Sequence, residues 1–182
     1  VYGRCRRTFD AANAVFFLRG EILHAPVDLD FFGTVDASKD ELTMALEQIG
    51  SLVVLKESPH IHIYQLNNVK IDVVDYQYSW IDDAVVMQGI RMASLRDIAA
   101  MKITAIIGRG TKKDFIDIAF LLQRFSINKI LDFYSQKYPD GSTFMAMKSL
   151  AYFDDAEEDI MPYMLTDISW EKIKSQILSE IF

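Results

Sequence analysis

The stretch Asp28-Leu29-Asp30-Phe31-Phe32-Gly33 decides the fold, because it combines a short apolar strand with two acidic residues. Successive side chains of a strand point to opposite faces, so Asp28 and Asp30 share one face while Leu29 and Phe31 share the other. Two carboxylates on one face are half of a divalent-metal site. The alternative is an exposed strand end with solvated acids, and an Asp-x-Asp pair alone does not decide between the two.

Composition limits the function classes that are open to the chain. Its 182 residues are 51% hydrophobic, which is enough for the core of one domain or of a small domain with a helical extension. The net charge of −7 argues against a protein that binds duplex DNA, because such binding needs many Lys and Arg residues. The single Cys5 excludes an intramolecular disulfide, and there is no run of about 18 apolar residues. We therefore expect a cytoplasmic protein that does not span a membrane.

Strand patterns dominate the first half of the chain, and helical patterns dominate the second. Asn67-Asn68 tolerates the positive φ of a tight hairpin turn between two strands. Ser94-x-x-Asp97 and Thr111-x-x-Asp114 are typical of helix starts, and Ser169-x-x-Lys172 is a weaker example. The elements expected from these patterns are a helix over 11–18, a strand over 27–32, a helix over 38–49, strands over 51–57, 60–66, 69–76 and 84–87, and helices beyond 94.

A sheet followed by helices indicates an α+β fold. We expect an α/β core over residues 1–93, with a mixed β-sheet, and a helical cluster over residues 94–182. The acids of the first region and the basic residues of the second together are typical of a nucleotidyltransferase-like site. In-line nucleotidyl transfer uses two Mg²⁺ ions, which activate the attacking hydroxyl and neutralise the triphosphate leaving group.

Asp72 is the candidate for a third metal ligand beside Asp28 and Asp30. It lies between Ile71 and Val73 in a strand pattern, where an acid buried without a cation would cost several kcal/mol. A bound metal would resolve that conflict. The three carboxylates are sufficient because Mg²⁺ keeps several of its waters.

The first helix of the second region carries two cations on one stripe. Lys102 and Arg109 are seven residues apart, at helical spacing, and Lys102 could reach the phosphates of an NTP. An ordinary solvent-facing lysine is the alternative. Asp117, in an apolar helix, needs a buried partner such as Lys102, and the sequence leaves open whether that pair is catalytic or structural.

Lys112 and Lys113 stand at a helix N-terminus, where the helix dipole disfavours cations. Their place beside Gly108-Arg109-Gly110 therefore indicates phosphate or an RNA backbone as the compensating anion. A solvated turn is the alternative. Asp114 is explained by helix capping, and we leave it out of the predicted site.

The combination of these segments resembles the AbiEii/AbiGii-type nucleotidyltransferase family, toxin components of bacterial toxin–antitoxin and phage-abortive systems. The resemblance implies Mg²⁺ and NTP use, an RNA acceptor such as tRNA, and a cognate antitoxin. It also implies that Asp28 and Asp30 bind metal, that Asp72 matches less firmly, and that Lys102 and Asp117 form an essential pair. The matching segments are 28–32, the strand with Asp72, 97–109, 113–117 and 148–156.

One feature of the family is missing from this sequence. Its members place a Gly-Gly-Ser or Gly-Gly-Thr turn before the Asp-x-Asp strand, where backbone amides can hold a triphosphate, whereas residues 8–26 contain only the isolated Gly20. Residues 1–26 would then be a divergent or a frameshifted segment. Two alternatives follow: a catalytically inactive domain that binds a nucleotide or a partner, and a phosphodiesterase that uses the same carboxylates.

Overall fold

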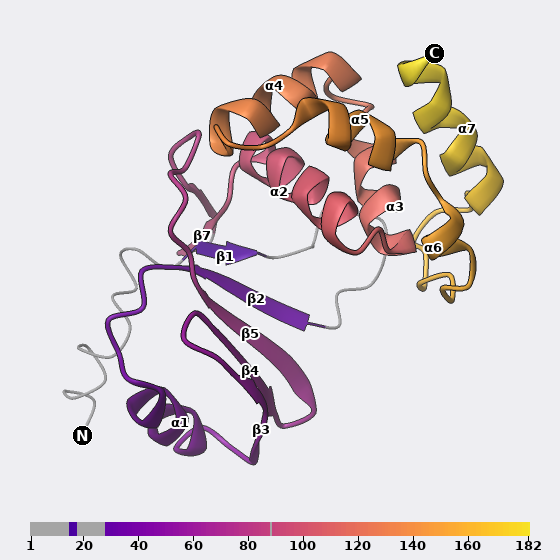
Figure 1. Cartoon of the computed structure of the whole chain (residues 1–182). Coiled ribbons are helices and arrows are strands. Elements are labelled where there is room, and N and C mark those ends of the chain that lie inside the picture. The colour runs from indigo at the N-terminus through magenta and orange to yellow at the C-terminus, as the bar shows by residue number, and fades with distance from the viewer. Residues whose placement is uncertain (1–14, 18–27, 88) are drawn as a thin grey trace. The chain divides into compact units, whose positions relative to one another are not determined.

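The structure is a computed structural model that describes residues 15–17, 28–87 and 89–182 (Figure 1). These residues group into two compact units. The sheet unit contains 15–17, 28–77 and 84–93, and the helical unit contains 78–83 and 94–182. The described strands lie in the sheet unit together with helix α1 (Lys39–Glu47), and the other described helices lie in the helical unit, which makes this an α+β protein, as the sequence predicts.

The sheet unit is built on one mixed sheet of seven strands in the order β3-β4-β5-β2-β1-β7-β6. The β2–β5 and β1–β7 pairs are parallel, and the other neighbours are antiparallel. The strands are β1 (Val15–Phe17), β2 (Asp28–Gly33), β3 (Leu52–Glu57), β4 (Ile61–Leu66), β5 (Val69–Asp75), β6 (Val85–Met87) and β7 (Ile90–Met92).

Helix α1 (Lys39–Glu47) covers one face of this sheet. Ser38 caps its N-terminus by accepting a hydrogen bond from the backbone N–H of Glu41, whose side chain bonds back to Ser38. Leu42 on the helix is buried against Tyr64, Ile71 and neighbouring apolar residues of the strands. Leu29 and Phe31 pack against the same core, so the other face of β2 carries the acids, as its alternation predicts.

The hairpin between β4 and β5 turns at Asn67 and Asn68, which have φ values of 49° and 68°. Asparagine is among the few non-glycine residues that adopt this left-handed region readily. The predicted hairpin is therefore confirmed. Asn67 also accepts a hydrogen bond of 3.0 Å from the backbone N–H of Ser51 through its side-chain oxygen.

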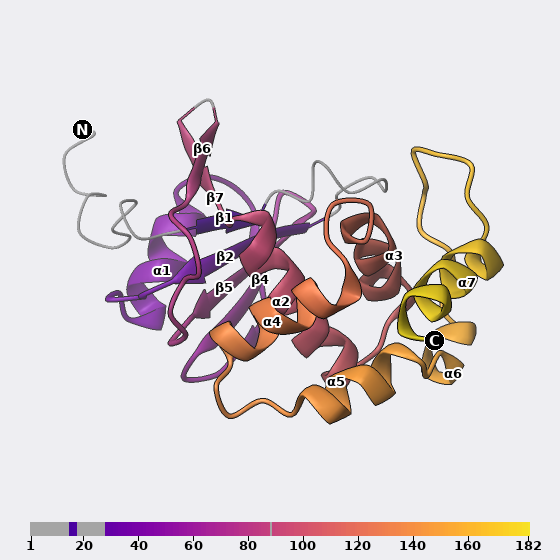
Figure 2. The same cartoon turned by 90° about the horizontal axis from the view of Figure 1, so that it is seen from above.

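The helical unit is arranged around α2, which contacts α3, α4 and α5 (Figure 2). Its core contains fully buried residues such as Ile103, Phe115, Ile130 and Ile173. Ser94 and Ser169 cap helices α2 and α7 as predicted. The helices are α2 (Leu95–Gly108), α3 (Lys112–Leu121), α4 (Ile127–Lys137), α5 (Thr143–Leu150), α6 (Asp154–Glu157) and α7 (Trp170–Ile181).

The expected helix over residues 11–18 is wrong for the part that the structure describes. Residues 15–17 form strand β1, which pairs with β2 on one side and β7 on the other. Their sequence, Val-Phe-Phe, favours strand over helix, and the two neighbouring strands satisfy its backbone groups. Residues 11–14 and 18 lie outside the described residues.

The helices that the structure describes include none that is long and apolar enough to cross a membrane.

Candidate functional site

The sheet unit places the predicted metal-binding acids on neighbouring strands. In the parallel pairing of β2 with β5, Asp30 lies opposite Asp72, and Asp28 lies opposite Lys70. Residues directly opposite each other point to the same face of a sheet, so all four share the face that α1 leaves uncovered. The register thus sets Asp72 opposite Asp30, although these two acids are more than 40 residues apart in the sequence, and Asp28 lies on the same face.

Asp72 has a cation beside it in the structure, which is Lys70. The Lys70 ammonium nitrogen lies 2.6 Å from Oδ1 and 2.7 Å from Oδ2 of Asp72. This ion pair offsets part of the free-energy cost of burying the Asp72 carboxylate, for which the sequence analysis invoked a bound metal. No group of three or more His, Cys, Asp or Glu side chains is arranged to hold a metal ion within the part of the chain that the structure describes. The metal-binding role of the three acids stays a prediction.

The helical unit places Lys102 between two acids of α3. The Lys102 ammonium group contacts the carboxylate of Asp117, and it lies 3.3 Å from Oδ1 of Asp114. Both carboxylates are fully buried, and the Lys102 side chain is only 6% exposed. The expected pairing of buried Asp117 with Lys102 is confirmed, and Lys102 is not a solvent-facing lysine.

Asp114, which the sequence analysis left out, is the centre of this cluster. Arg109 donates to it from Nε at 2.9 Å and from Nη2 at 3.0 Å, in the paired geometry that fits a carboxylate. The Thr111 hydroxyl donates to the same carboxylate at 2.7 Å. Burial would raise the pKa of Asp114, but the bonds from Arg109 and the charge of Lys102 hold this pKa well below its ordinary value.

Helix capping was the wrong explanation for Asp114, because the Thr111 side chain makes no capping bond to the backbone of α3. The signal that could have found its role is the Lys102–Arg109 stripe. Lys102 on α2 and Arg109 directly after it carry two positive charges, and Asp117 balances only one of them.

Lys112 and Lys113, expected to meet phosphate or RNA, have different surroundings. Lys112 is buried, and its ammonium group donates to the backbone carbonyls of Glu157 at 3.2 Å and Asp159 at 2.6 Å. Its backbone N–H also donates to the Asp159 carboxylate at 2.8 Å. The partners of the Lys112 ammonium group and of its backbone N–H are therefore groups of the protein itself. Lys113 is partly exposed.

Comparison with known proteins agrees with this arrangement of motifs. The family model described as "Nucleotidyl transferase AbiEii toxin, Type IV TA system" matches residues 25–180. The chain belongs to this family. A relative from Aquifex aeolicus (strain VF5), the uncharacterized protein aq_aa25, is 30% identical over 157 residues, which cover 81% of this chain and 73% of the relative.

Two solved structures from Helicobacter pylori share the fold of this AbiEii-family chain. JHP933 is 15% identical with a TM-score of 0.55, and the match covers 93% of this chain and 82% of JHP933. A protein described as a candidate nucleotidyltransferase is 16% identical with a TM-score of 0.57, and the match covers 93% and 84% of the two chains. The expected nucleotidyltransferase-like α+β fold is thereby confirmed.

A second buried ion pair in this AbiEii-family chain was not expected from the sequence. Lys137 on α4 lies 2.7 Å from Oδ1 of Asp97, and neither side chain is exposed. Asp97 also accepts hydrogen bonds from the backbone N–H groups of Ile81 at 2.9 Å and Asp82 at 3.3 Å. Lys137 in turn donates to the carbonyl of Ser79 at 3.0 Å. The pair therefore ties residues 79–82 to helices α2 and α4.

Hydrogen bonds and burial shift the pKa values of both groups in this second pair. Burial alone would raise the pKa of Asp97, but the bonds from Lys137, Ile81 and Ser94 lower it below its ordinary value. Burial lowers the pKa of Lys137, and Asp97 opposes that shift. Asp97 thus acts in the structure as the acid that anchors the start of α2.

Proposed function

We propose that this AbiEii-family protein is a metal-dependent nucleotidyltransferase that transfers NMP from an NTP to an RNA acceptor such as tRNA. In this reaction an acceptor oxygen forms a bond to the α-phosphorus, the bond from that phosphorus to the bridging oxygen breaks, and pyrophosphate leaves. The acceptor hydroxyl loses its proton. Family membership supports the reaction class. The observation that carries the proposal is the register that sets Asp30 beside Asp72, with Asp28 on the same face.

The acids of the sheet unit fit Mg²⁺ in their chemistry, since carboxylate oxygens are the ligands that this ion prefers. Asp28, Asp30 and Asp72 would hold it, and Lys70 would then release the Asp72 carboxylate. Bound Mg²⁺ would favour ionisation of the acceptor hydroxyl and neutralise charge on the triphosphate. Lys70, which already lies against Asp72, would neutralise the excess of negative charge on this face before substrate binds.

The residues of the helical unit would contribute a cation of fixed position. Two buried carboxylates hold the Lys102 ammonium group, and Asp117 would fix its position as the partner of this lysine. Arg109 bonds to Asp114 but is 58% exposed, so it is the more accessible of the two cations for an NTP phosphate. Lys113 remains a candidate for phosphate contact, whereas Lys112 would have to leave the carbonyls of Glu157 and Asp159.

The test is incorporation of label from α-³²P-labelled NTPs into tRNA in the presence of Mg²⁺. We expect label with the wild type, its loss on adding EDTA, and a loss of at least 100-fold with Asp30→Asn. Asp36→Asn is the matched control, because Asp36 is an exposed acid just beyond the same strand. Equal label with wild type and Asp30→Asn would remove the proposal, and shortening of the RNA would favour a phosphodiesterase.

A second candidate is an inactive domain that binds nucleotide or a partner. The observation that favours it is the sequence of residues 8–26, which has no Gly-Gly-Ser or Gly-Gly-Thr turn to hold a triphosphate. Isothermal titration with each NTP separates the two candidates. Binding of NTP without product on any RNA would support this second function.

The family is described as a toxin of a Type IV toxin–antitoxin system, and we propose that a cognate antitoxin opposes this chain in its cell. Induced expression should then slow growth, and Asp30→Asn should relieve that effect. Normal growth with well-expressed wild-type protein would contradict a toxin role.

A further inference from the structure

The negative charge of this chain is concentrated in one segment of the helical unit. Residues 149–171 contain seven acidic residues and no Lys or Arg, whereas the rest of the chain contains 19 acidic and 19 basic residues. This segment therefore accounts for the entire net charge of −7. Its acids are Asp154, Asp155, Glu157, Glu158, Asp159, Asp167 and Glu171.

Interactions within the unit engage three of these acids, Glu157, Asp159 and Glu171, and fasten the base of the loop from α6 to α7. Glu157 accepts hydrogen bonds from Trp170 at 3.1 Å and from Lys174 at 2.6 Å. Asp159 is bonded to Lys112 through both its carboxylate and its backbone carbonyl. Asp154, Asp155 and Glu158, in contrast, are exposed. The loop is thus held at both ends while acids remain at its start.

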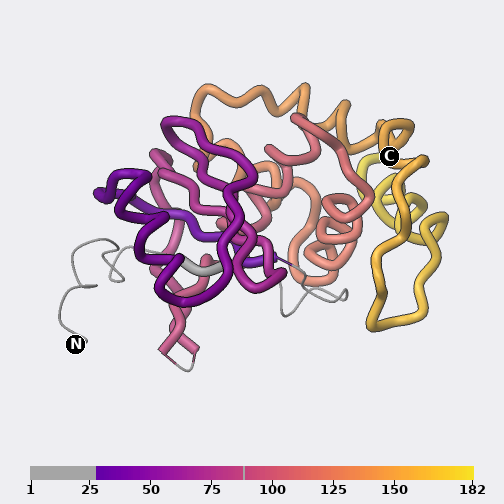
Figure 3. The backbone as a smooth tube through the Cα atoms, turned by 90° about the horizontal axis from the view of Figure 1, so that it is seen from below, coloured from indigo at the N-terminus to yellow at the C-terminus, as the bar shows by residue number. Residues whose placement is uncertain are grey.

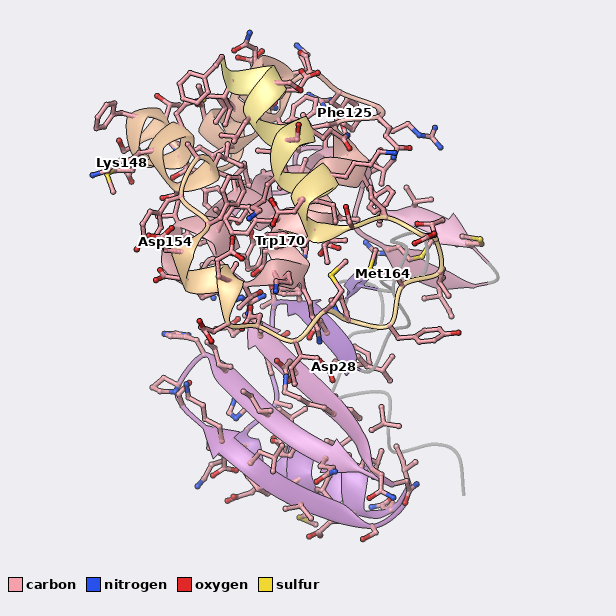
Figure 4. All side chains as sticks on the ribbon, turned by 90° about the vertical axis from the view of Figure 1, so that its right-hand side faces the viewer. Asp28, Phe125, Lys148, Asp154, Met164 and Trp170 are labelled. Carbon is pink, nitrogen blue, oxygen red and sulfur yellow. The ribbon has the colours of Figure 1, made fainter. Side chains whose placement is uncertain are left out.

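The loop itself alternates between residues that pack inward and apolar residues that face solvent. Met161 and Met164 pack against the core of the helical unit. Figure 4 labels Met164 on this loop. Ile160 is 92% exposed, Tyr163 is 77% exposed and Leu165 is 60% exposed. Figure 3 shows the loop running out from the helices and returning to α7. The inward methionines contact the core, whereas the three outward side chains leave most of their surface open to solvent.

Exposed apolar side chains that follow exposed acids along the segment from α6 to α7 indicate a surface that another molecule covers. The carboxylates of Asp155 and Asp154 also raise the pKa of the exposed Tyr152 hydroxyl, which places a further aromatic ring within their field. RNA is a poor occupant, because its phosphates would be repelled by a segment that has seven acids and no basic residue. A polypeptide that offers cations together with apolar side chains complements both properties.

We propose that Ile160, Tyr163 and Leu165, with Asp154, Asp155 and Glu158, form a docking surface for a partner protein that presents a basic amphipathic segment. We call these six residues the acidic–apolar surface. The partner's apolar side chains cover the loop, and its Lys or Arg residues meet the acids. This function goes beyond nucleotidyl transfer and does not depend on it.

The experiment measures binding of a fluorescent 18-residue peptide made of Lys and Leu. The Leu residues are placed at helical spacing, so that they form one face of a helix and the Lys residues form the other. Two variants separate the contributions of the surface: Ile160→Ser/Tyr163→Ser/Leu165→Ser keeps every acid, and Asp154→Asn/Asp155→Asn/Glu158→Gln keeps every apolar residue. We expect each to bind the peptide at least tenfold more weakly than the wild type. Thermal unfolding of both variants verifies that they are folded.

Matched controls test whether binding belongs to this surface rather than to the acidic chain in general. Asp36→Asn/Glu47→Gln/Glu180→Gln removes three exposed acids elsewhere and should bind as the wild type does. Peptides with Glu in place of Lys, or Ser in place of Leu, should bind at least tenfold more weakly. Equal peptide affinity for all protein variants would overturn the proposal.

Two other occupants give different results. If tRNA binding falls tenfold in the surface variants, the surface serves RNA and the proposal is wrong. If sedimentation velocity shows that the wild type self-associates and the serine variant does not, the occupant is a second copy of this chain, and the proposal is again overturned.

Discussion

The ammonium nitrogen of Lys102 lies 3.3 Å from Oδ1 of Asp114 and also contacts the carboxylate of Asp117, so one buried cation serves two buried acids. Arg109 supplies the second positive charge from the end of α2. The two cations, Lys102 and Arg109, together balance the two acids, Asp114 and Asp117. Loss of Lys102, Asp114 or Asp117, the three buried members, leaves a charge without compensation where there is little access to water.

Replacing Asp114 should destabilise the protein strongly. Asp114→Ala leaves the charges of Lys102 and Arg109 facing one acid, and we expect the free energy of unfolding to fall by about 3–5 kcal/mol. Urea denaturation measures this change. Asp132→Ala is the control, because the Asp132 side chain is 69% exposed and its loss should cost less than about 0.5 kcal/mol. Equal midpoints for the two variants would contradict a structural role of the cluster.

The lowered pKa of Asp114 predicts how stability depends on pH. A carboxyl group whose pKa is lower in the folded than in the unfolded state stabilises the fold above the unfolded pKa, near 3.8. That stabilisation is lost as pH falls below about 4, because the unfolded chain then binds the proton first. Asp114→Asn should therefore show a shallower loss of stability than wild type between pH 4 and pH 2. Parallel curves would show that Asp114 does not carry this dependence.

The Asp97–Lys137 pair should control how firmly residues 79–82 are held. Lys137→Met leaves the buried Asp97 carboxylate without its cation, and we expect a loss of about 3 kcal/mol in the free energy of unfolding. Hydrogen exchange of the Ile81 and Asp82 amides, which donate to Asp97, should become faster. Lys129→Met is the control, since the Lys129 side chain is 59% exposed. Unchanged exchange at both amides would show that the pair does not hold this segment.

Local patterns predicted most of the fold because the physical cause lies within a few residues. The alternation of Asp28-Leu29-Asp30-Phe31 assigned faces correctly, and Asn67-Asn68 located a hairpin. Strand β1 escaped detection because its pairing with β2 and β7 depends on distant parts of the chain.

The candidate site was predictable only where burial alone demanded a partner. An acid within an apolar helix requires a cation, so Asp117 pointed to Lys102. Asp114 had a local explanation as a capping residue, and this hid its bonds to Arg109. Lys137 is 40 residues from Asp97 and carries no local signal of burial, so only the packing of α2 against α4 reveals it.

Lys70 should act as a competitor of Mg²⁺, a prediction that rests on the proposed nucleotidyltransferase activity. Its ammonium group lies against both oxygens of Asp72, on the face that carries Asp28 and Asp30. A cation that must be displaced raises the Mg²⁺ concentration needed, and partly exposed ion pairs contribute about 0.5–1 kcal/mol. Lys70→Gln should therefore lower the Mg²⁺ concentration for half-maximal NMP incorporation by about two- to fivefold. Lys56→Gln, at an exposed position of β3, should leave it unchanged. A higher Mg²⁺ requirement for Lys70→Gln would mean that Lys70 supports the substrate instead of competing with the metal.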